Sequence, residues 1–145
     1  MKARRTEIAE IVALETGKSF KAALGETDGA TALGFFMAGE GQRLYGRTTT
    51  SGTENKYNMT IRQPIGVAGL IVPANTPIAN VAWKAFPALV CGNGVVLKAA
   101  EASPATAWIF AEIANAAGVP EGILHIIPGY GGEAGLPLVG SPTLS

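Results

Sequence analysis

The sequence has 145 residues, 48% of them hydrophobic, which is enough for the core of one domain of ordinary size. Its 11 basic and 11 acidic residues cancel, so net charge gives no attraction to nucleic acid or to an anionic membrane surface. The single cysteine excludes an internal disulfide, and no run of about 18 apolar residues predicts a transmembrane helix. We therefore expect a cytoplasmic protein that binds neither nucleic acid nor membrane.

The charged residues are unevenly distributed along the chain. Residues 1–63 contain 16 of the 22, and the six in residues 64–145 are Lys84, Lys98, Glu101, Glu112, Glu121 and Glu133. The second part is therefore predicted to be deeply buried, and the few charges left in it need a specific reason to be there.

Two helices are predicted in the first part. Apolar residues recur at helical spacing in residues 3–16, and Gly17 is a natural end for that helix. Ser19 can cap a second helix that runs to about Tyr45. Several glycines interrupt this second segment, so we expect a break near Gly25.

Strands follow the helices. Residues 46–55 are predicted as a polar loop, and the alternating segment KYNMTIRQ, residues 56–63, as an edge strand. From Pro64 on, short β-branched runs alternate with segments of helical length, which is typical of an α/β fold with a parallel sheet. We predict strands buried on both faces at 65–72, 94–98 and 122–129, and helices at 77–91, 103–118 and from residue 131.

Polar or glycine residues follow each predicted parallel strand. Asn75 stands between two prolines after the first strand, Lys98 ends the second and is followed by Glu101, and the glycine-rich turn 128–132 follows the third. Proline donates no backbone N–H, so the first strand must stop at this asparagine. Because the carboxyl ends of parallel strands share an edge where ligands bind, we expect these groups to converge there.

The chemistry of this edge suits a nucleotide. Lys98 offers a cation, and Glu101 offers acceptors for a ribose diol. Gly129, Gly131 and Gly132 let backbone approach a ligand closely. A metal is disfavoured because the sequence contains no cluster of cysteine and histidine.

Each of these residues also has a purely structural interpretation. Lys98 and Glu101 could form a solvated ion pair, and the glycines could be ordinary turn residues. Asn75 could cap the following helix, and the stem of Lys84 could lie along its own helix. Their joint occurrence at three strand ends favours the functional interpretation.

Cys91 and His125 are predicted to be structural. Cys91 lies in the apolar segment ALVCGNG with no general base beside it, so we expect an inert, buried thiol. His125 lies inside the apolar run ILHII, where a histidine is usually part of the core.

An ordered series of motifs resembles the aldehyde dehydrogenase superfamily. It comprises a PIGV strand, a P-x-N-x-P turn, A-W-K, P-A-L-x-x-G-N, V-V-L-K-x-x-E and a G-x-P-x-G segment that ends in P-G. Nearly all of residues 64–142 matches this pattern, and ETGK at residues 15–18 resembles the same family. The resemblance implies amino-terminal helices followed by half of a Rossmann-like dinucleotide-binding domain.

The resemblance also implies roles for individual residues. Asn75 matches the asparagine whose amide stabilises the oxyanion of a thiohemiacetal, and Lys84 matches a lysine held near the active centre. Lys98 and Glu101 match residues that contact the adenosine ribose of the cofactor. Further cofactor contacts are implied at Val72, Pro73, Ala74, Ala100, Gly129 and Gly131.

The cofactor implied is NAD, with NADP as the alternative. The charge of Glu101 would repel a 2′-phosphate, whereas Lys98 nearby could offset that repulsion. The substrate implied is a small-molecule aldehyde, oxidised to a carboxylic acid. We expect a homo-oligomer, because KYNMTIRQ resembles the strand at the family's subunit-assembly region.

The sequence departs from the family pattern in two respects. Ala74 and Thr76 stand where the family usually has tryptophan and phenylalanine, which changes the shape of the substrate pocket. The chain also lacks the F-T-G-S turn, the glutamate general base and the catalytic cysteine, which follow later in the family pattern. We therefore expect an inactive amino-terminal-half fragment of a longer, NAD(P)-dependent subunit that needs a carboxyl-terminal half.

Three segments are expected within this fragment: helices of the cofactor domain at 1–54, the assembly strand at 55–63 and the partial dinucleotide-binding domain at 64–145. Two other functions remain open. The chain could be a non-catalytic nucleotide-binding module, which would bind NAD or AMP without turnover. It could instead be one piece of a split enzyme, which would regain activity with its partner.

Overall fold

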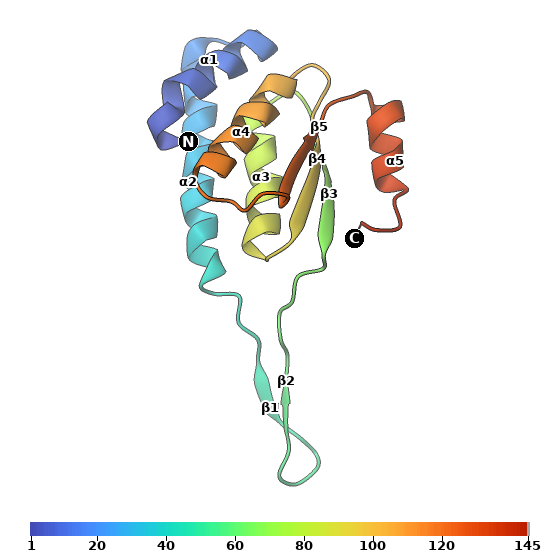
Figure 1. The fold of residues 1–145 in the computed structure, drawn as a ribbon. Coiled ribbons are helices and arrows are strands. Elements are labelled where there is room, and N and C mark those ends of the chain that lie inside the picture. The colour runs from blue at the N-terminus through green and yellow to red at the C-terminus, as the bar shows by residue number, and fades with distance from the viewer. Residues whose placement is uncertain (145) are drawn as a thin grey trace.

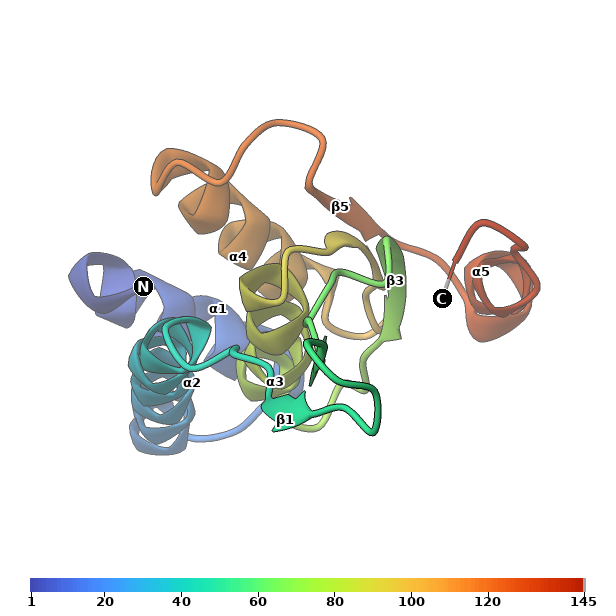
Figure 2. The ribbon, with the colours of Figure 1, turned by 90° about the horizontal axis from the view of Figure 1, so that it is seen from below.

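The computed structural model describes residues 1–144 and stacks helices on a small parallel sheet (Figure 1). Helices α3 and α4 lie on one side of the sheet with α1 and α2 outside them, and α5 lies on the other side (Figures 1 and 2). Within residues 1–144, no helix combines the length and the apolar character needed to span a membrane. The elements are η1 Lys2–Arg4, α1 Arg5–Thr16, α2 Phe20–Gly41, β1 Thr48–Thr50, β2 Tyr57–Met59, β3 Val67–Ile71, α3 Pro77–Val90, β4 Gly94–Lys98, α4 Pro104–Ala116, β5 Leu124–Ile127, the π-helical turn η2 Gly131–Gly135 and α5 Leu136–Val139.

The parallel sheet confirms the predicted α/β class and has the order β3-β4-β5. Its register places Ile71 opposite Lys98, and Lys98 opposite Ile127. The last paired residues of the three strands therefore stand in one row, with Lys98 in the middle. The segments that follow all leave from this carboxyl edge.

The prediction that the strands are buried on both faces is wrong for β3, and also for β5, where His125 is exposed. Val67 and Ile71 remain 38% and 39% exposed, whereas Ala68 between them is buried. The side chains of a strand alternate between faces, and the helices pack on one face only. On the other face Leu138 of the short α5 and Leu144 lie against Gly69, and this cover leaves Val67 and Ile71 exposed.

Helix α2 is continuous over 22 residues and ends at Gly41, so the predicted break near Gly25 is wrong. Two of its glycines serve close packing against α3. A Cβ atom at Gly34 would lie 3.1 Å from the ring of Phe86, and one at Gly41 would lie 2.7 Å from Val90. The packing of α2 on α3 therefore overrides the low helix propensity of glycine.

Strands β1 and β2 form an antiparallel hairpin that projects away from the body of the molecule (Figure 1). Residues 46–55, predicted as a polar loop, contain β1, and the predicted strand at 56–63 is reduced to Tyr57–Met59. Thr48 pairs with Met59, and all six residues of the two strands are exposed. The threonines are β-branched and suit a strand once a partner strand is present.

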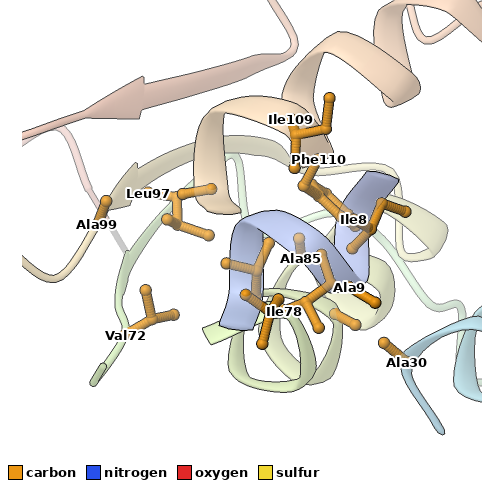
Figure 3. Packing of buried hydrophobic residues seen from close by; sticks show 14 of the residues in the cluster. Ile8, Ala9, Ala30, Val72, Ile78, Ala85, Leu97, Ala99, Ile109 and Phe110 are labelled. Carbon is orange, nitrogen blue, oxygen red and sulfur yellow. The ribbon is translucent and has the colours of Figure 1, made fainter. Parts of the chain in front are cut away.

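The hydrophobic core lies between the helices and the sheet (Figure 3). Its largest fully buried side chains come from α1, α3, β4 and α4, and include Ile8, Ile78, Leu97 and Phe110. Phe110 also meets Phe86 of α3 edge-on, with ring centroids 5.3 Å apart. Helix α1 is thus part of the same core as the sheet.

Carboxylates from the first two helices cap the two crossover helices. Ser103 precedes α4 as predicted but makes no side-chain cap; instead, the oxygens of Glu15 accept hydrogen bonds from the backbone N–H groups of Ala105 (2.6 Å) and Thr106 (2.8 Å). At α3, Oε1 of Glu26 accepts from Ile78 (3.0 Å) and Ala79 (3.3 Å). A carboxylate at a helix amino terminus also interacts favourably with the helix dipole.

The predicted end of α1 and the predicted start of α2 are confirmed, whereas α2 ends at Gly41 rather than near Tyr45. Gly17 adopts the left-handed conformation (φ 70°) that closes α1, and the hydroxyl of Ser19 accepts from the N–H of Ala22 at 3.3 Å. The tight turn between them is what brings Glu15 and Glu26 within reach of the next two helices.

Replacing Glu26 with alanine is expected to lower the free energy of unfolding by about 2–3 kcal/mol. The Glu26 side chain is only 6% exposed, so its loss leaves two N–H groups and the Lys18 ammonium short of an acceptor. Urea unfolding followed by circular dichroism measures the change. Glu10→Ala, on the exposed face of α1, is the matched control. Equal stability of the two variants would contradict the capping role.

Candidate functional site

The three strand ends predicted to converge are neighbours at the carboxyl edge of the sheet. Beyond the strand β3, the N–H of Val72 donates to the carbonyl of Lys98 at 3.2 Å, and the N–H of Ala99 donates to the carbonyl of Ile127 at 3.0 Å. Adjacent strands lie about 4.8 Å apart. The segments carrying Asn75, Glu101 and the glycine turn therefore start side by side.

Lys98 is buried and held by one acceptor. Its side chain is 4% exposed, and its Nζ donates to Oε2 of Glu101 at 2.9 Å, while the Glu101 side chain is 50% exposed. The interpretation as a fully solvated pair is therefore wrong for the lysine. Ala100 between them is also buried. The hydrogen bond from Lys98 lowers the pKa of Glu101, which favours the ionised carboxylate. With half of its side chain exposed, this carboxylate faces solvent at the edge of the sheet.

Asn75 is exposed and held at two points. Its backbone carbonyl accepts from Nζ of Lys18 at 3.0 Å, and its side-chain Oδ1 accepts from Nδ2 of Asn80 at 3.0 Å. It does not cap α3, because Glu26 accepts from the first free N–H groups of that helix. The helix-cap interpretation of Asn75 is therefore wrong.

Sequence reasoning missed the part that Lys18, Glu26 and Asn80 play around Asn75. Lys18 pairs with Glu26, and the two together join α2, the start of α3 and the turn at Asn75. Lys18 and Glu26 are eight residues apart in sequence, and residues at that spacing are not expected to contact each other within one helix. Lys18 lies in the segment ETGK, whose resemblance to a family pattern was the one available indication.

The residues around Asn75 differ in exposure. Val72 is buried, Pro73 is exposed and Ala74 is partly buried. Lys84 of α3 is exposed and its Nζ donates to the backbone carbonyl of Ile71, the last residue of β3. Lys84 therefore ties α3 to the end of the strand, which places its ammonium group at the same edge.

The glycine turn after β5 contains one residue that must be glycine. Gly129 has φ 138°, and a Cβ there would lie 2.9 Å from Cβ of Ala134. Gly131 is exposed, and a Cβ there would have no neighbour within 4 Å among the described residues. The backbone at Gly131 is therefore accessible at this edge, and the positive φ of Gly129 makes the conformation of the turn possible.

Cys91 and His125 lie outside this site. Cys91 is exposed, so its predicted burial is wrong; it follows α3 and precedes β4 at the opposite edge of the sheet, about 13 Å of strand away from Lys98. His125 is exposed on β5 rather than in the core, with Nε2 3.0 Å from the carbonyl of Gly122. Among residues 1–144, no three side chains are grouped as ligands for a metal ion.

Comparison with known proteins gives a consistent result. A family profile for the aldehyde dehydrogenase family matches residues 1–145. The 3-sulfolactaldehyde dehydrogenase of Priestia aryabhattai is 40% identical over 136 residues, covering 91% of this chain and 28% of that protein. The NADP(+) succinate-semialdehyde dehydrogenase of Escherichia coli is 38% identical over 142 residues, covering 98% of this chain and 30% of that protein.

Solved structures show the same relationship. An NADP-dependent enzyme of Escherichia coli superposes with a TM-score of 0.95 at 37% identity, covering 99% of this chain and 30% of that one. An NADP-dependent glyceraldehyde-3-phosphate dehydrogenase from Bacillus halodurans, solved with NADP, superposes with a TM-score of 0.93 at 34% identity. The chain spans about 28% of the length of the curated relatives it matches. By its matched residues and by its fold, the chain belongs to the aldehyde dehydrogenase family.

Proposed function

We propose that residues 1–145 supply the oxyanion donor and the adenosine side of the cofactor site in an NAD(P)-dependent enzyme that oxidises an aldehyde to a carboxylic acid. The observation that carries the proposal is the row at the carboxyl edge of the sheet. Asn75, the Lys98–Glu101 pair and the Gly129 turn leave this row on neighbouring strands. Ligands of open parallel sheets bind at that edge.

The described residues fit a dinucleotide. Glu101 offers an ionised, half-exposed carboxylate as acceptor for ribose hydroxyls, and the buried Lys98 holds it in place. Gly129 and Gly131, on either side of the exposed Tyr130, offer backbone without a Cβ atom for the base. The segments next to the Lys98–Glu101 pair are Val72, Pro73 and Ala74, which follow β3, and Ala100, which lies between Lys98 and Glu101. The bound cofactor would supply the hydride acceptor.

Asn75 would stabilise the negative charge that develops on the aldehyde oxygen. A donor held in place before the reaction stabilises such a charge without reorganising. Lys18 and Asn80 hold Asn75 in this way. Lys84, bound to the end of β3, adds a positive charge near the same edge.

The nucleophile would come from outside these residues. Oxidation through a thiohemiacetal needs a thiolate, and the one thiol of the sequence, Cys91, lies at the opposite edge of the sheet. By themselves, residues 1–145 would therefore bind a nucleotide without turning over an aldehyde. Since these residues would bind the nucleotide and the thiolate would come from elsewhere, we infer that they are one portion of a larger catalytic unit.

We further propose that the protein acts in the cytoplasm as a homo-oligomer, with the hairpin β1–β2 at the assembly surface. Tyr57, Met59 and Ile61 are 78%, 62% and 69% exposed on an arm that extends from the body (Figure 1). Apolar side chains on a projecting arm favour burial against another subunit. In this proposal residues 1–54 and 64–145 form the cofactor portion, and 55–63 belong to the assembly region.

In a subunit of family length that carries this segment, Asn75→Ala is expected to lower kcat by about 10²–10³-fold and to leave the Kd for the cofactor nearly unchanged. The substitution removes the oxyanion donor but no ribose contact. Steady-state kinetics with an aldehyde substrate and calorimetric titration with NAD give the two values. An unchanged kcat would contradict the role of Asn75.

Glu101→Gln is expected to raise kcat/KM with NADP relative to NAD. The negative charge of Glu101 opposes a 2′-phosphate, and glutamine keeps an acceptor and a similar shape without that charge. Because Lys98 lowers the pKa of Glu101, the charge persists as pH falls below the usual glutamate range and is lost only at a lower pH. Titration of Glu101 is therefore expected to contribute nothing to the pH dependence of the NAD preference between about pH 5 and 8, where the 2′-phosphate of NADP, with a second pKa of about 6, is the group that changes charge.

The matched control is Glu121→Gln, an exposed acid in the loop before β5, at the amino end of that strand. It should leave the ratio of the two cofactors unchanged. A wild-type enzyme that already prefers NADP, or a Glu101→Gln variant with the wild-type ratio, would show that Glu101 does not set the preference.

A further inference from the structure

Asn80, in the first turn of α3, places one side-chain NH₂ group among three oxygens of the turn before it. Its Nδ2 lies 3.0 Å from Oδ1 of Asn75, 3.1 Å from Oγ1 of Thr76 and 3.5 Å from the backbone carbonyl of Pro73. Two donor hydrogens thus face three acceptors. The side chain closes the loop between the end of β3 and the start of α3.

These contacts indicate which atom of the Asn80 amide and which atom of the Asn75 amide, oxygen or nitrogen, faces the other. A backbone carbonyl only accepts hydrogen bonds, so placing the Asn80 nitrogen toward Pro73, at 3.5 Å, avoids a contact between two acceptor oxygens. The Asn75 atom that faces this nitrogen must then be the oxygen. Nδ2 of Asn75 is consequently the end that remains for a ligand, and it is the donor end.

The support for Asn80 is rigid. Its backbone N–H donates to the carbonyl of Thr76 at 2.8 Å in the first turn of α3, and the preceding N–H groups of that helix donate to Glu26. On the other side, Lys18 holds the backbone carbonyl of Asn75. A group held by a helix is positioned more accurately than one held by a loop.

We propose that Asn80 is a positioning residue that sets the amide orientation of Asn75, so that the NH₂ group of Asn75 faces the aldehyde oxygen. This inference rests on the proposed oxyanion role of Asn75. Without Asn80, the Asn75 amide would rotate between two orientations, and one of them presents an oxygen to the developing negative charge. Asn80 itself makes no contact with the substrate.

Two substitutions of opposite character test this role in a subunit of family length. Asn80→Leu removes the donor, so the Asn75 amide samples both orientations with similar weight, and kcat should fall about twofold. Asn80→Asp keeps the size but presents only acceptors, which turns the NH₂ group of Asn75 inward. Its kcat should therefore fall further than that of Asn80→Leu, with KM for the cofactor unchanged in both.

A role in packing or stability predicts the reverse order. Aspartate is nearly isosteric with asparagine and is favoured in the first turn of a helix, whereas leucine changes both shape and polarity. A wild-type kcat for Asn80→Asp together with a lowered kcat for Asn80→Leu would therefore overturn the proposal. The control is Asn115→Leu, an exposed asparagine in the last turns of α4, which should leave kcat unchanged.

The double variant Asn75→Ala, Asn80→Asp separates this inference from the proposed function. If Asn80 acts through Asn75, the double variant should be no slower than Asn75→Ala alone. An additional loss as large as that of Asn80→Asp would mean that Asn80 acts independently, and the inference would fail while the role of Asn75 stands. A neutral Asn75→Ala would instead remove the proposed function, and this inference with it.

Discussion

The carboxylate of Glu26 joins two segments that are distant in sequence, residues 18–26 and residues 75–79, and the site depends on this junction. From its place on α2, it accepts hydrogen bonds from the first N–H groups of α3 and pairs with Lys18, which in turn holds the carbonyl of Asn75. Glu15 does the same for the start of α4. The amino-terminal helices therefore fix where both crossover helices begin, and with them the carboxyl edge of the sheet.

The chemistry of that edge follows from burial and register. Lys98 lies in the middle of the row of strand ends and is buried, so its ammonium group has to be paired, and Glu101 is the residue that pairs with it. The pairing orients a carboxylate toward solvent where a ribose would bind. On the neighbouring strand, the prolines stop β3 and leave Asn75 exposed for contact with a ligand. One edge thus combines a group suited to the cofactor with a group suited to the reacting oxygen.

Much of this arrangement could be predicted from the sequence, because periodicity and turn residues are local signals. The alternation of strands and helices, the ends of α1 and β4, and the convergence at Asn75, Lys98 and Gly129 are of this kind. The continuous α2 was not predictable, because two of its glycines, Gly34 and Gly41, are explained only by contact with α3. The roles of Glu26 and Asn80 depend on contacts across a fold, which a spacing rule does not contain. Cys91 and His125 were placed in the core because an apolar neighbourhood in sequence does not show which face of an element is covered.

The most direct test is a crystal structure of a family-length subunit carrying this segment with NAD bound. We expect the hydroxyls of the adenosine ribose within hydrogen-bond distance of the Glu101 carboxylate, with Lys98 still paired to it. We also expect the adenine beside the Gly129 turn, and the amide oxygen of Asn75 on Asn80 with its nitrogen directed toward the nicotinamide side. A dinucleotide bound away from the carboxyl edge of β4 would contradict this assignment, and so would an Asn75 amide in the opposite orientation at a resolution that distinguishes nitrogen from oxygen.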